Sequence, residues 1–223
     1  MNPISTPKMK KKTLFLIALI SSMAMAQIAP KQPTDFVPKG YVVFDKIYGD
    51  LNKDGSTDCV LIIKGTDSDQ YLGNLDRNRR GIIVLLYSKG RYELAVHNKD
   101  CFSSENEDGG AYFPPILSIE IKKGHLNIYY AYGKYGYWYY TFRLKNDDFE
   151  LIGYDQSNNR GPIIESVTSI NFLTHKKQVK VNTNENASGG DEVFQTTWKP
   201  IKVKKRYKLS EIKDFDTLDL SVF

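Results

Sequence analysis

From residue 41 to residue 209 the chain consists of short apolar stretches divided by polar turns every eight to twelve residues or so, which is typical of all-β proteins. The stretches form neighbouring pairs around turns rich in Asp, Asn, Gly, Ser and Lys. The pattern therefore predicts successive β-hairpins. Their paired strands are residues 41–47 and 59–64, 82–87 and 92–96, 117–121 and 126–130, 137–144 and 149–154, 167–173 and 178–181, and 192–198 and 202–209.

Alternation within these stretches indicates sheets with one apolar and one wetter face. Leu117, Ile119 and Ile121, for example, are separated by single polar residues, so they share a face of one strand. We expect an antiparallel meander that forms either a sandwich or an open barrel, whereas a propeller is less favoured. Only residues 210–215 resemble a short helix, with Ser210 as the candidate N-cap. We expect a single β-rich domain over residues 41–223.

The N-terminus has the three parts of a cleavable signal peptide, which we assign to residues 1–26. Four lysines precede an apolar run at residues 14–20, and Ala24-Met25-Ala26 forms a small-x-small cleavage site. The run is much shorter than the roughly 20 residues that span a bilayer, so no transmembrane span is expected in the mature chain. Residues 27–40 contain three prolines without periodicity and predict an extended linker. The chain is therefore expected to be exported, to the periplasm or the extracellular space.

Export changes the charge that bears on partners. The whole chain has 31 Lys and Arg against 26 Asp and Glu, a formal net charge of +5. The signal peptide carries four lysines and no acid, so the mature chain has 27 bases against 26 acids. A nearly neutral mature chain argues against a nucleic-acid partner.

The two cysteines, Cys59 and Cys101, would meet an oxidising compartment after export, where a disulfide can form. In the chain-entropy model, closing that loop would contribute roughly 4 kcal/mol to stability. The alternative is a pair of unpaired thiols, with Cys59 buried at the start of an apolar strand. The sequence leaves both alternatives open.

Residues 50–58 read Asp-Leu-Asn-Lys-Asp-Gly-Ser-Thr-Asp and predict a calcium loop. Calcium prefers oxygen ligands, and Gly55 allows the sharp turn after the third of them. The expected ligands are the side chains of Asp50, Asn52, Asp54 and Asp58 and the backbone carbonyl of Ser56. An EF-hand would place a glutamate where this chain has Leu61, and strand-like segments flank the loop instead of helices. The alternative is a polar hairpin turn that uses these residues for their backbone preferences.

This loop resembles the calcium loop that joins two strands in FG-GAP repeats of integrin-type β-propellers. The pattern Asp-x-Asp/Asn-x-Asp-Gly-x-x-Asp occurs once here, whereas a propeller needs several blades. The loop, the hairpin at residues 88–91 and residues 137–155 are together similar to a family of exported bacterial proteins, many of them lipoproteins, with no assigned activity. That resemblance spans most of residues 41–175 and implies that they form one domain. No cysteine precedes Cys59, so lipid attachment does not carry over.

Residues 129–142 are rich in aromatic rings. On one strand Trp138, Tyr140 and Phe142 share a face that we expect to be core. Tyr137, Tyr139 and Arg143 share the opposite face, which is a candidate ligand-contact surface because exposed tyrosines stack on sugar rings or on protein surfaces. The alternative is cross-strand aromatic pairing that only stabilises the sheet.

We find no catalytic motif in the sequence. His97, His125 and His175 lie far apart, and no serine occupies a Gly-x-Ser-x-Gly turn. We therefore expect an exported, non-enzymatic binding or interaction module that is stabilised by one structural calcium ion and contacts a protein or a glycan. The alternative is a secreted hydrolase, or an inhibitor of one, whose site is assembled only in the tertiary structure.

Overall fold

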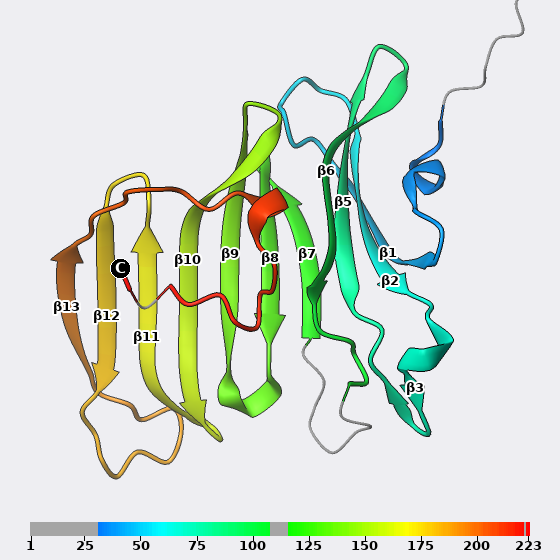
Figure 1. Ribbon diagram of the computed structural model, residues 1–223. Coiled ribbons are helices and arrows are strands. Elements are labelled where there is room, and N and C mark those ends of the chain that lie inside the picture. The colour runs from blue at the N-terminus through cyan, green and yellow to red at the C-terminus, as the bar shows by residue number, and fades with distance from the viewer. Residues whose placement is uncertain (1–30, 108–115, 221) are drawn as a thin grey trace, which may run out of the picture.

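The computed structural model describes residues 31–107, 116–220 and 222–223. The signal peptide expected at residues 1–26 and residues 27–30 of the expected linker lie outside the described residues. In the described residues the fold is all-β, with antiparallel sheets and four short 3-10 turns (Figure 1). No helix in this part of the chain has the length and apolar character to cross a membrane.

The elements follow one another as successive hairpins. The 3-10 turns are η1 (Pro33–Phe36), η2 (Ser68–Gln70), η3 (Gly133–Tyr135) and η4 (Leu209–Glu211). The strands are β1 (Tyr41–Gly49), β2 (Asp58–Gly65), β3 (Tyr71–Leu72), β4 (Leu75–Asp76), β5 (Arg80–Ser88), β6 (Arg91–Phe102), β7 (Ile116–Lys122), β8 (His125–Ala131), β9 (Gly136–Lys145), β10 (Asp148–Arg160), β11 (Ile163–Asn171), β12 (Lys176–Asn182) and β13 (Phe194–Pro200).

The strands form two main sheets. The four-stranded sheet has the order β1-β2-β5-β6, the seven-stranded sheet has the order β13-β12-β11-β10-β9-β8-β7, and β3 and β4 make a small hairpin. Every hairpin predicted before residue 182 is present, because β1 pairs with β2, β5 with β6, β7 with β8, β9 with β10 and β11 with β12. The two main sheets share one core and neither closes into a barrel, which agrees with the sandwich rather than the open barrel.

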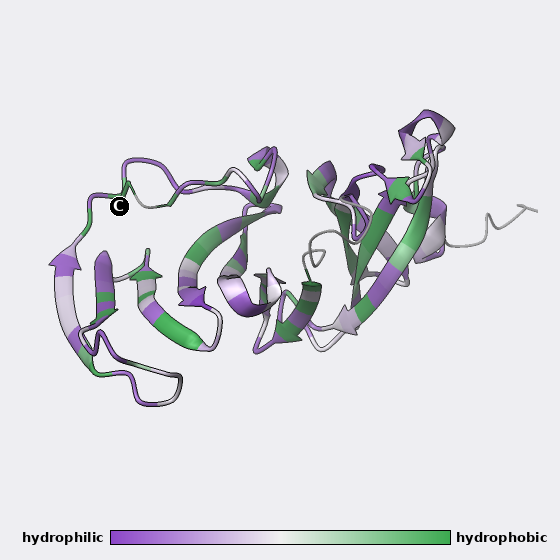
Figure 2. Ribbon diagram, turned by 90° about the horizontal axis from the view of Figure 1, so that it is seen from below, coloured by the Kyte–Doolittle hydropathy of each residue, from purple (hydrophilic) through white to green (hydrophobic). Residues whose placement is uncertain are grey.

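The main core lies between the two sheets and the C-terminal segment, which we define as residues 201–220. Even-numbered residues of β2, such as Val60 and Ile62, meet Tyr140 and Phe142 of β9 in one apolar cluster. The C-terminal segment crosses the same face of the seven-stranded sheet (Figure 2). Phe215 in this segment stacks on Phe102 with ring centroids 4.7 Å apart. One core therefore spans residues that lie far apart along the chain.

The second face of the four-stranded sheet is covered by the N-terminal segment. Odd-numbered residues of β2, including Leu61 and Ile63, form a separate buried cluster against Phe36 and Val37. Residues 31–40, expected to be part of an extended linker, are therefore packed, and η1 begins where the Asp35 carboxylate accepts a hydrogen bond from the Gln32 amide at 2.7 Å. The prolines limit regular structure, but the apolar residues after them dock on the sheet.

The last predicted hairpin is wrong in its second strand. β13 pairs with β12, and residues 202–209 form no strand except a single bridge between Lys208 and Glu150. The chain leaves the sheet at Ile201, which is buried, and then crosses the core towards Leu209, which is fully buried. Burial of these apolar residues on the inner face prevents the segment from extending along the edge.

The short helix predicted at residues 210–215 is also wrong, because only η4 is helical there. The Asn98 side-chain amide donates to the carbonyl oxygens of Leu209 at 2.6 Å and Ile212 at 2.7 Å. The amide of Phe215 donates to the Cys101 carbonyl at 2.9 Å. The backbone groups of Leu209, Ile212 and Phe215 are therefore bonded to residues of β6 instead of to one another in a helix.

Candidate functional site

The loop at residues 50–57, between β1 and β2, lies where the two main sheets meet. Leu51 is 2% exposed and belongs to the main core, which anchors the loop from inside. The Lys53 side chain packs directly on Gly124, in the turn between β7 and β8. Gly55 has φ +83°, the left-handed conformation expected for the glycine of this turn. The loop thus contacts the core and the turn between β7 and β8.

Backbone amides inside the loop are bonded by the predicted ligands. The Asp50 carboxylate accepts from the amides of Lys53 at 2.6 Å and Gly55 at 3.0 Å. Asn52 Oδ1 accepts from the Asp54 amide at 3.0 Å, and Asp54 Oδ1 accepts from the Ser56 amide at 2.7 Å. The Ser56 amide also lowers the pKa of Asp54, so that carboxylate is charged at neutral pH. Each of these oxygens has a second lone pair, so the bonds leave it able to bind a cation.

Asp58 has a different environment from the other predicted ligands. It is fully buried, and its carboxylate accepts from the Leu51 amide at 2.7 Å and from the Tyr87 amide of β5 at 2.8 Å. Burial is the main cause that raises its pKa, and the charges of Asp54 and Asp50 add to it. The described residues contain no group of three or more His, Cys, Asp or Glu side chains arranged to hold a metal. Asp50, Asn52 and Asp54 have oxygen donors of the type that calcium prefers, whereas the Asp58 carboxylate is bonded to the Leu51 amide and joins the loop to β5 through the Tyr87 amide.

The predicted tyrosine face is present on the seven-stranded sheet, on the side opposite the main core, which we call the outer face. Register places one residue from each strand in a single cross-strand row. The row is Ser118, Tyr129, Tyr139, Asp155, Ser169, Gln178 and Trp198, from β7 to β13. Trp138, Tyr140 and Phe142 point to the core side, as predicted. No segment of the described chain crosses the outer face of the central strands (Figure 2).

Tyr129, Tyr137 and Tyr139 are partly buried neighbours on this face. The rings of Tyr129 and Tyr137 lie 5.6 Å apart at an angle of 34°, so part of the predicted cross-strand pairing is present as well. Burial raises the pKa of Tyr137 and Tyr139, with smaller contributions from Asp155 for Tyr137 and mainly Glu120 for Tyr139. Both hydroxyl groups therefore remain protonated donors over the physiological range. Arg143, the third predicted residue, lies on the same strand opposite His125.

Gly136 determines where this strand begins. Its φ is +120°, and an added Cβ would overlap the backbone carbonyl of Ser157 on β10. Only glycine fits the close approach that brings β9 alongside β10 one residue before Tyr137.

The structure does not bring the two cysteines together. Cys59 is buried in the cluster beneath the N-terminal segment, whereas Cys101 is buried in the main core. Both are free thiols, and burial raises the pKa of Cys59 to about 11. The Cys59–Cys101 disulfide is therefore not formed, because alternation along the strands directs the two side chains to opposite faces of the four-stranded sheet.

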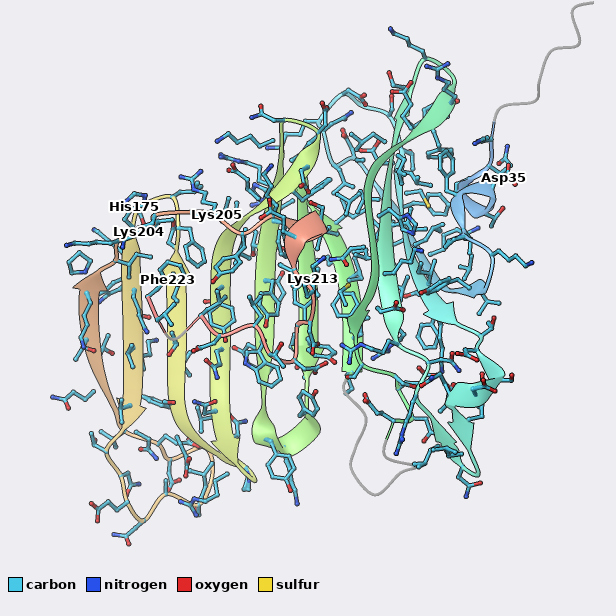
Figure 3. The ribbon with its side chains drawn as sticks, in the orientation of Figure 1. Asp35, His175, Lys204, Lys205, Lys213 and Phe223 are labelled. Atoms are coloured by element: carbon cyan, nitrogen blue, oxygen red, sulfur yellow. The ribbon has the colours of Figure 1, made fainter. Side chains whose placement is uncertain are left out.

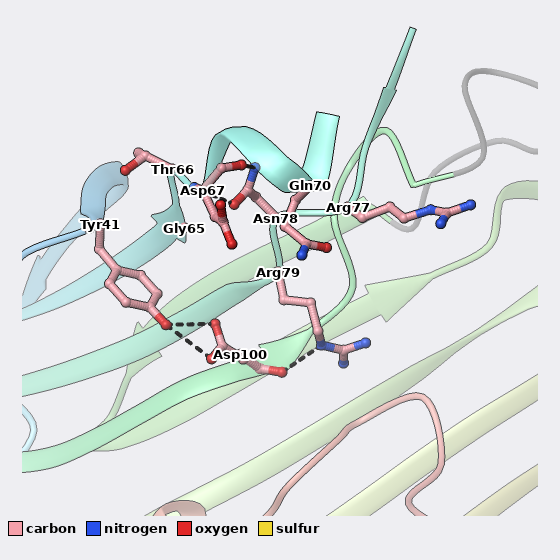
Figure 4. Close-up of a pocket in the computed structure, with 10 residues that line it drawn as sticks. Tyr41, Gly65, Thr66, Asp67, Gln70, Arg77, Asn78, Arg79 and Asp100 are labelled. Carbon is pink, nitrogen blue, oxygen red and sulfur yellow. Dashed lines mark hydrogen bonds between the residues drawn. The ribbon is translucent and has the colours of Figure 1, made fainter. Parts of the chain in front are cut away.

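A cleft that the sequence did not indicate opens at one end of the four-stranded sheet, with a volume of about 390 Å³ (Figure 4). Tyr41 donates to both carboxylate oxygens of Asp100, at 2.9 and 3.0 Å, and burial together with this contact raises the pKa of Tyr41 to about 12. Arg79 Nε donates to the Asp100 carbonyl at 2.7 Å. The cleft is lined by Gly40, Tyr41, Gly65, Thr66, Asp67, Gln70, Arg77, Asn78, Arg79 and Asp100. Serine, cysteine and histidine, the usual partners of a nucleophilic site, are absent from this lining.

Behind the cleft, ionised groups are buried in a polar network. Lys64 pairs with Asp76 at 2.5 Å and with Glu105, and Arg80 donates to the Ser103 carbonyl at 2.8 Å. The network continues through Tyr130, whose hydroxyl donates to Asp216 at 2.8 Å in the C-terminal segment. Its members come from five separate stretches of chain, so no local motif could have indicated it. Through these ion pairs and hydrogen bonds the network connects the four-stranded sheet to the seven-stranded sheet and to the C-terminal segment.

The histidines remain separate in the fold. His97 is on β6, His125 begins β8 and His175 lies in the turn before β12. Burial lowers the pKa of His97 and of His125, which keeps both imidazoles neutral at physiological pH.

No protein-family model, curated protein or solved structure matches this chain.

Proposed function

We propose that this chain is an exported, non-enzymatic binding module that contacts a glycan through the outer face of its seven-stranded sheet. One observation carries this proposal. Tyr129, Tyr137 and Tyr139 lie side by side on adjacent strands of a face that no described segment crosses. The opposite face of the same strands is filled by the core and the C-terminal segment. The signal peptide predicted at residues 1–26 supports export, and an N-terminus at Gln27 in the exported protein would test it.

The chemistry around the tyrosines favours a glycan over an apolar protein surface. Glu120 and Asp155 lie beside Tyr139 on the same face, and Gln178 lies further along the same cross-strand row, so planar hydrogen-bonding groups accompany the aromatic rings. A sugar ring offers an apolar face to an aromatic ring and hydroxyl groups to the neighbouring carboxylates and amides. Protein-binding patches are instead depleted of charge at their centre.

The proposal is tested by titrating the purified chain with cellohexaose, chitohexaose and soluble peptidoglycan fragments. We expect at least one to bind, and the double variant Tyr137→Ala/Tyr139→Ala to lose tenfold or more in affinity, since central tyrosines dominate such contacts. Tyr71→Ala is the matched control, because Tyr71 is 50% exposed on β3, away from this face. An unchanged melting temperature of the double variant would confirm that the sheet is intact.

Two outcomes would contradict the glycan assignment. One is equal affinity in the double variant and the control. The other is failure of all three probes while the tyrosine variants lose a protein partner, which would replace the glycan with a protein surface.

We propose further that one calcium ion stabilises the loop at residues 50–58. The support is the spacing of its oxygen ligands, the carboxylate and amide oxygens of Asp50, Asn52 and Asp54, and the position of the loop between the sheets. When bound, the ion would neutralise the repulsion between the loop carboxylates and hold the hairpin closed. It supplies no catalytic chemistry in this proposal.

Thermal unfolding with calcium or with EGTA tests this second proposal. At calcium about 100 times its dissociation constant, stability rises by about 2.7 kcal/mol, which is about 5–10 °C in Tm for a domain of this size. Asp54→Ala should abolish the shift, whereas Asp45→Ala, an exposed aspartate on β1, should retain it. Equal melting temperatures in calcium and EGTA would exclude the ion.

A further inference from the structure

β13 is the exposed edge of the seven-stranded sheet. All seven of its residues are exposed, and among the described strands it pairs only with β12. Two large rings stand on it, Phe194 with 37% exposure and Trp198 with 63%. An edge strand of this length with aromatic residues is a template for pairing with another strand. In Figure 1 it is the outermost strand of that sheet, at the left of the view.

Two hydrogen bonds at the ends of β13 show which of its main-chain N–H and C=O groups face β12. The Thr183 amide donates to the Val193 carbonyl at 2.7 Å, and the Ile201 amide donates to the His175 carbonyl at 3.0 Å. Both pairs continue the β12–β13 register, so odd-numbered residues face β12. The N–H and C=O groups of Phe194, Thr196 and Trp198 therefore point away from the sheet. Pro200, the next even-numbered residue after Trp198, has no N–H to offer at this edge.

These three residues are self-complementary about a two-fold axis through Thr196. An antiparallel copy in this register places Thr196 opposite Thr196 and Phe194 opposite Trp198 of the second copy. Hydrogen-bonded pairs exchange both bonds, so the seam would contain about six main-chain hydrogen bonds. Phe194 and Trp198 share the outer face, so each aromatic ring also meets a ring across the seam.

The charged residues at the two ends of β13 are also complementary under this two-fold symmetry. The loop before β13 carries Glu185, Asp191 and Glu192, and backbone amides lower the pKa of both Asp191 and Glu192. The opposite end of the edge carries Lys176, Lys199 and Lys202, and Lys204 and Lys205 lie close to the same end in Figure 3. Antiparallel pairing brings the acidic end of one copy to the basic end of the other at both ends of the seam.

We propose that the chain forms a two-fold symmetric dimer by antiparallel pairing of β13 with β13 of a second copy, centred on Thr196. The seven-stranded sheets of the two copies then become one continuous sheet. The seam is narrow, so the dimer dissociates on dilution. The seam does not include Tyr129, Tyr137 or Tyr139, so the dimer can be tested independently of glycan binding.

Sedimentation over a concentration series tests the association. The purified chain should approach twice its 25.5 kDa mass as concentration rises. Thr196→Lys places two like charges opposite each other on the axis and should give a monomer at every concentration. Ser118→Lys adds the same charge on β7, the other edge of the sheet, and should leave the dimer intact. A chain that stays monomeric at the highest concentration, or a dimer that survives Thr196→Lys, would overturn the proposal.

Cross-linking tests the register. In a hydrogen-bonded antiparallel pair the Cα atoms lie about 5.5 Å apart, which is within disulfide range. Thr196→Cys should therefore give a covalent dimer under mild oxidation. Gln195→Cys is the matched control, because in this register the two copies of residue 195 are offset along the strands by about 7 Å and should not cross-link. Cross-linking of Gln195→Cys in preference to Thr196→Cys would reject this register.

Discussion

The two main sheets differ in how many of their faces are covered. Seven of the eight residues of β2 in the four-stranded sheet are buried, because the main core covers one face and the N-terminal segment covers the other. In the seven-stranded sheet the main core and the C-terminal segment cover the inner face, and the strands become more exposed from β10 to β13. The central strands of the first sheet are therefore buried on both faces, whereas the second sheet leaves its outer face and its β13 edge more exposed.

The difference also appears in the ionic contacts. Lys64 and Asp76 of the four-stranded side form a pair whose side chains are 10% and 12% exposed. On the seven-stranded sheet Arg160 and Glu165 form a pair at 2.8 Å whose side chains are 66% and 52% exposed. Ion pairs of similar geometry should therefore differ greatly in how a substitution that breaks them changes the free energy of unfolding.

Neighbouring alanine substitutions give the largest expected contrast. On β2, Leu61→Ala and Ile62→Ala should each cost about 2–5 kcal/mol, because the two side chains are buried in different clusters. On β9, Phe142→Ala should cost about 3–5 kcal/mol, while Thr141→Ala on the outer face should cost less than about 1 kcal/mol. Denaturant unfolding measures all four. Similar costs for Thr141→Ala and Phe142→Ala would mean that the outer face is covered.

The ion pairs give a smaller contrast. Lys64→Ala should cost about 3 kcal/mol, since it leaves the buried carboxylate of Asp76 without its cation. Arg160→Ala should change stability by less than about 1 kcal/mol, because water solvates the exposed Glu165. The same unfolding assay compares them. Equal costs would contradict the difference in burial.

Acid unfolding gives the smallest expected effect. Burial on its own raises the pKa of Asp76, but hydrogen bonds from Lys64 and Asn78 outweigh it and lower the pKa below the ordinary value. Its contribution to stability is therefore present above about pH 4 and is lost as pH falls through the lowered pKa. Asp76→Asn should make stability less dependent on pH in that acid range. An unchanged pH profile for this variant would show that Asp76 is not the responsible group.

Local patterns in the sequence were sufficient for most of the strands. Alternation and turn residues located the hairpins of the two main sheets from β1 to β12, although not the small β3–β4 hairpin, because strand formation and tight turns depend on neighbouring residues. The predictions of a strand at residues 202–209 and of a helix at residues 210–215 were wrong, and residues 31–40 of the predicted linker are packed on a sheet. In each case the decisive contact is distant, as where Asn98 bonds the carbonyls of Leu209 and Ile212.

The candidate sites follow the same division. Spacing alone located the loop at residues 50–58 and the shared face of Tyr137 and Tyr139, since both lie within one loop or one strand. It did not foresee that Asp58 would be bonded to Tyr87 of β5, or that Tyr129 of β8 would join the tyrosines. The cleft beside Asp100 and the network around Lys64 had no local signal.

The sequence by itself determined the hairpins, the direction in which each strand side chain points and the spacing of the loop oxygens, because these depend on residues a few positions apart. Only the tertiary structure decided which faces are covered. It separated Cys59 from Cys101 across a sheet, placed the C-terminal segment over one face of the seven-stranded sheet, and left β13 at its edge. The physical reason is that burial depends on which distant segments compete for an apolar face, and strand periodicity contains no information about that competition.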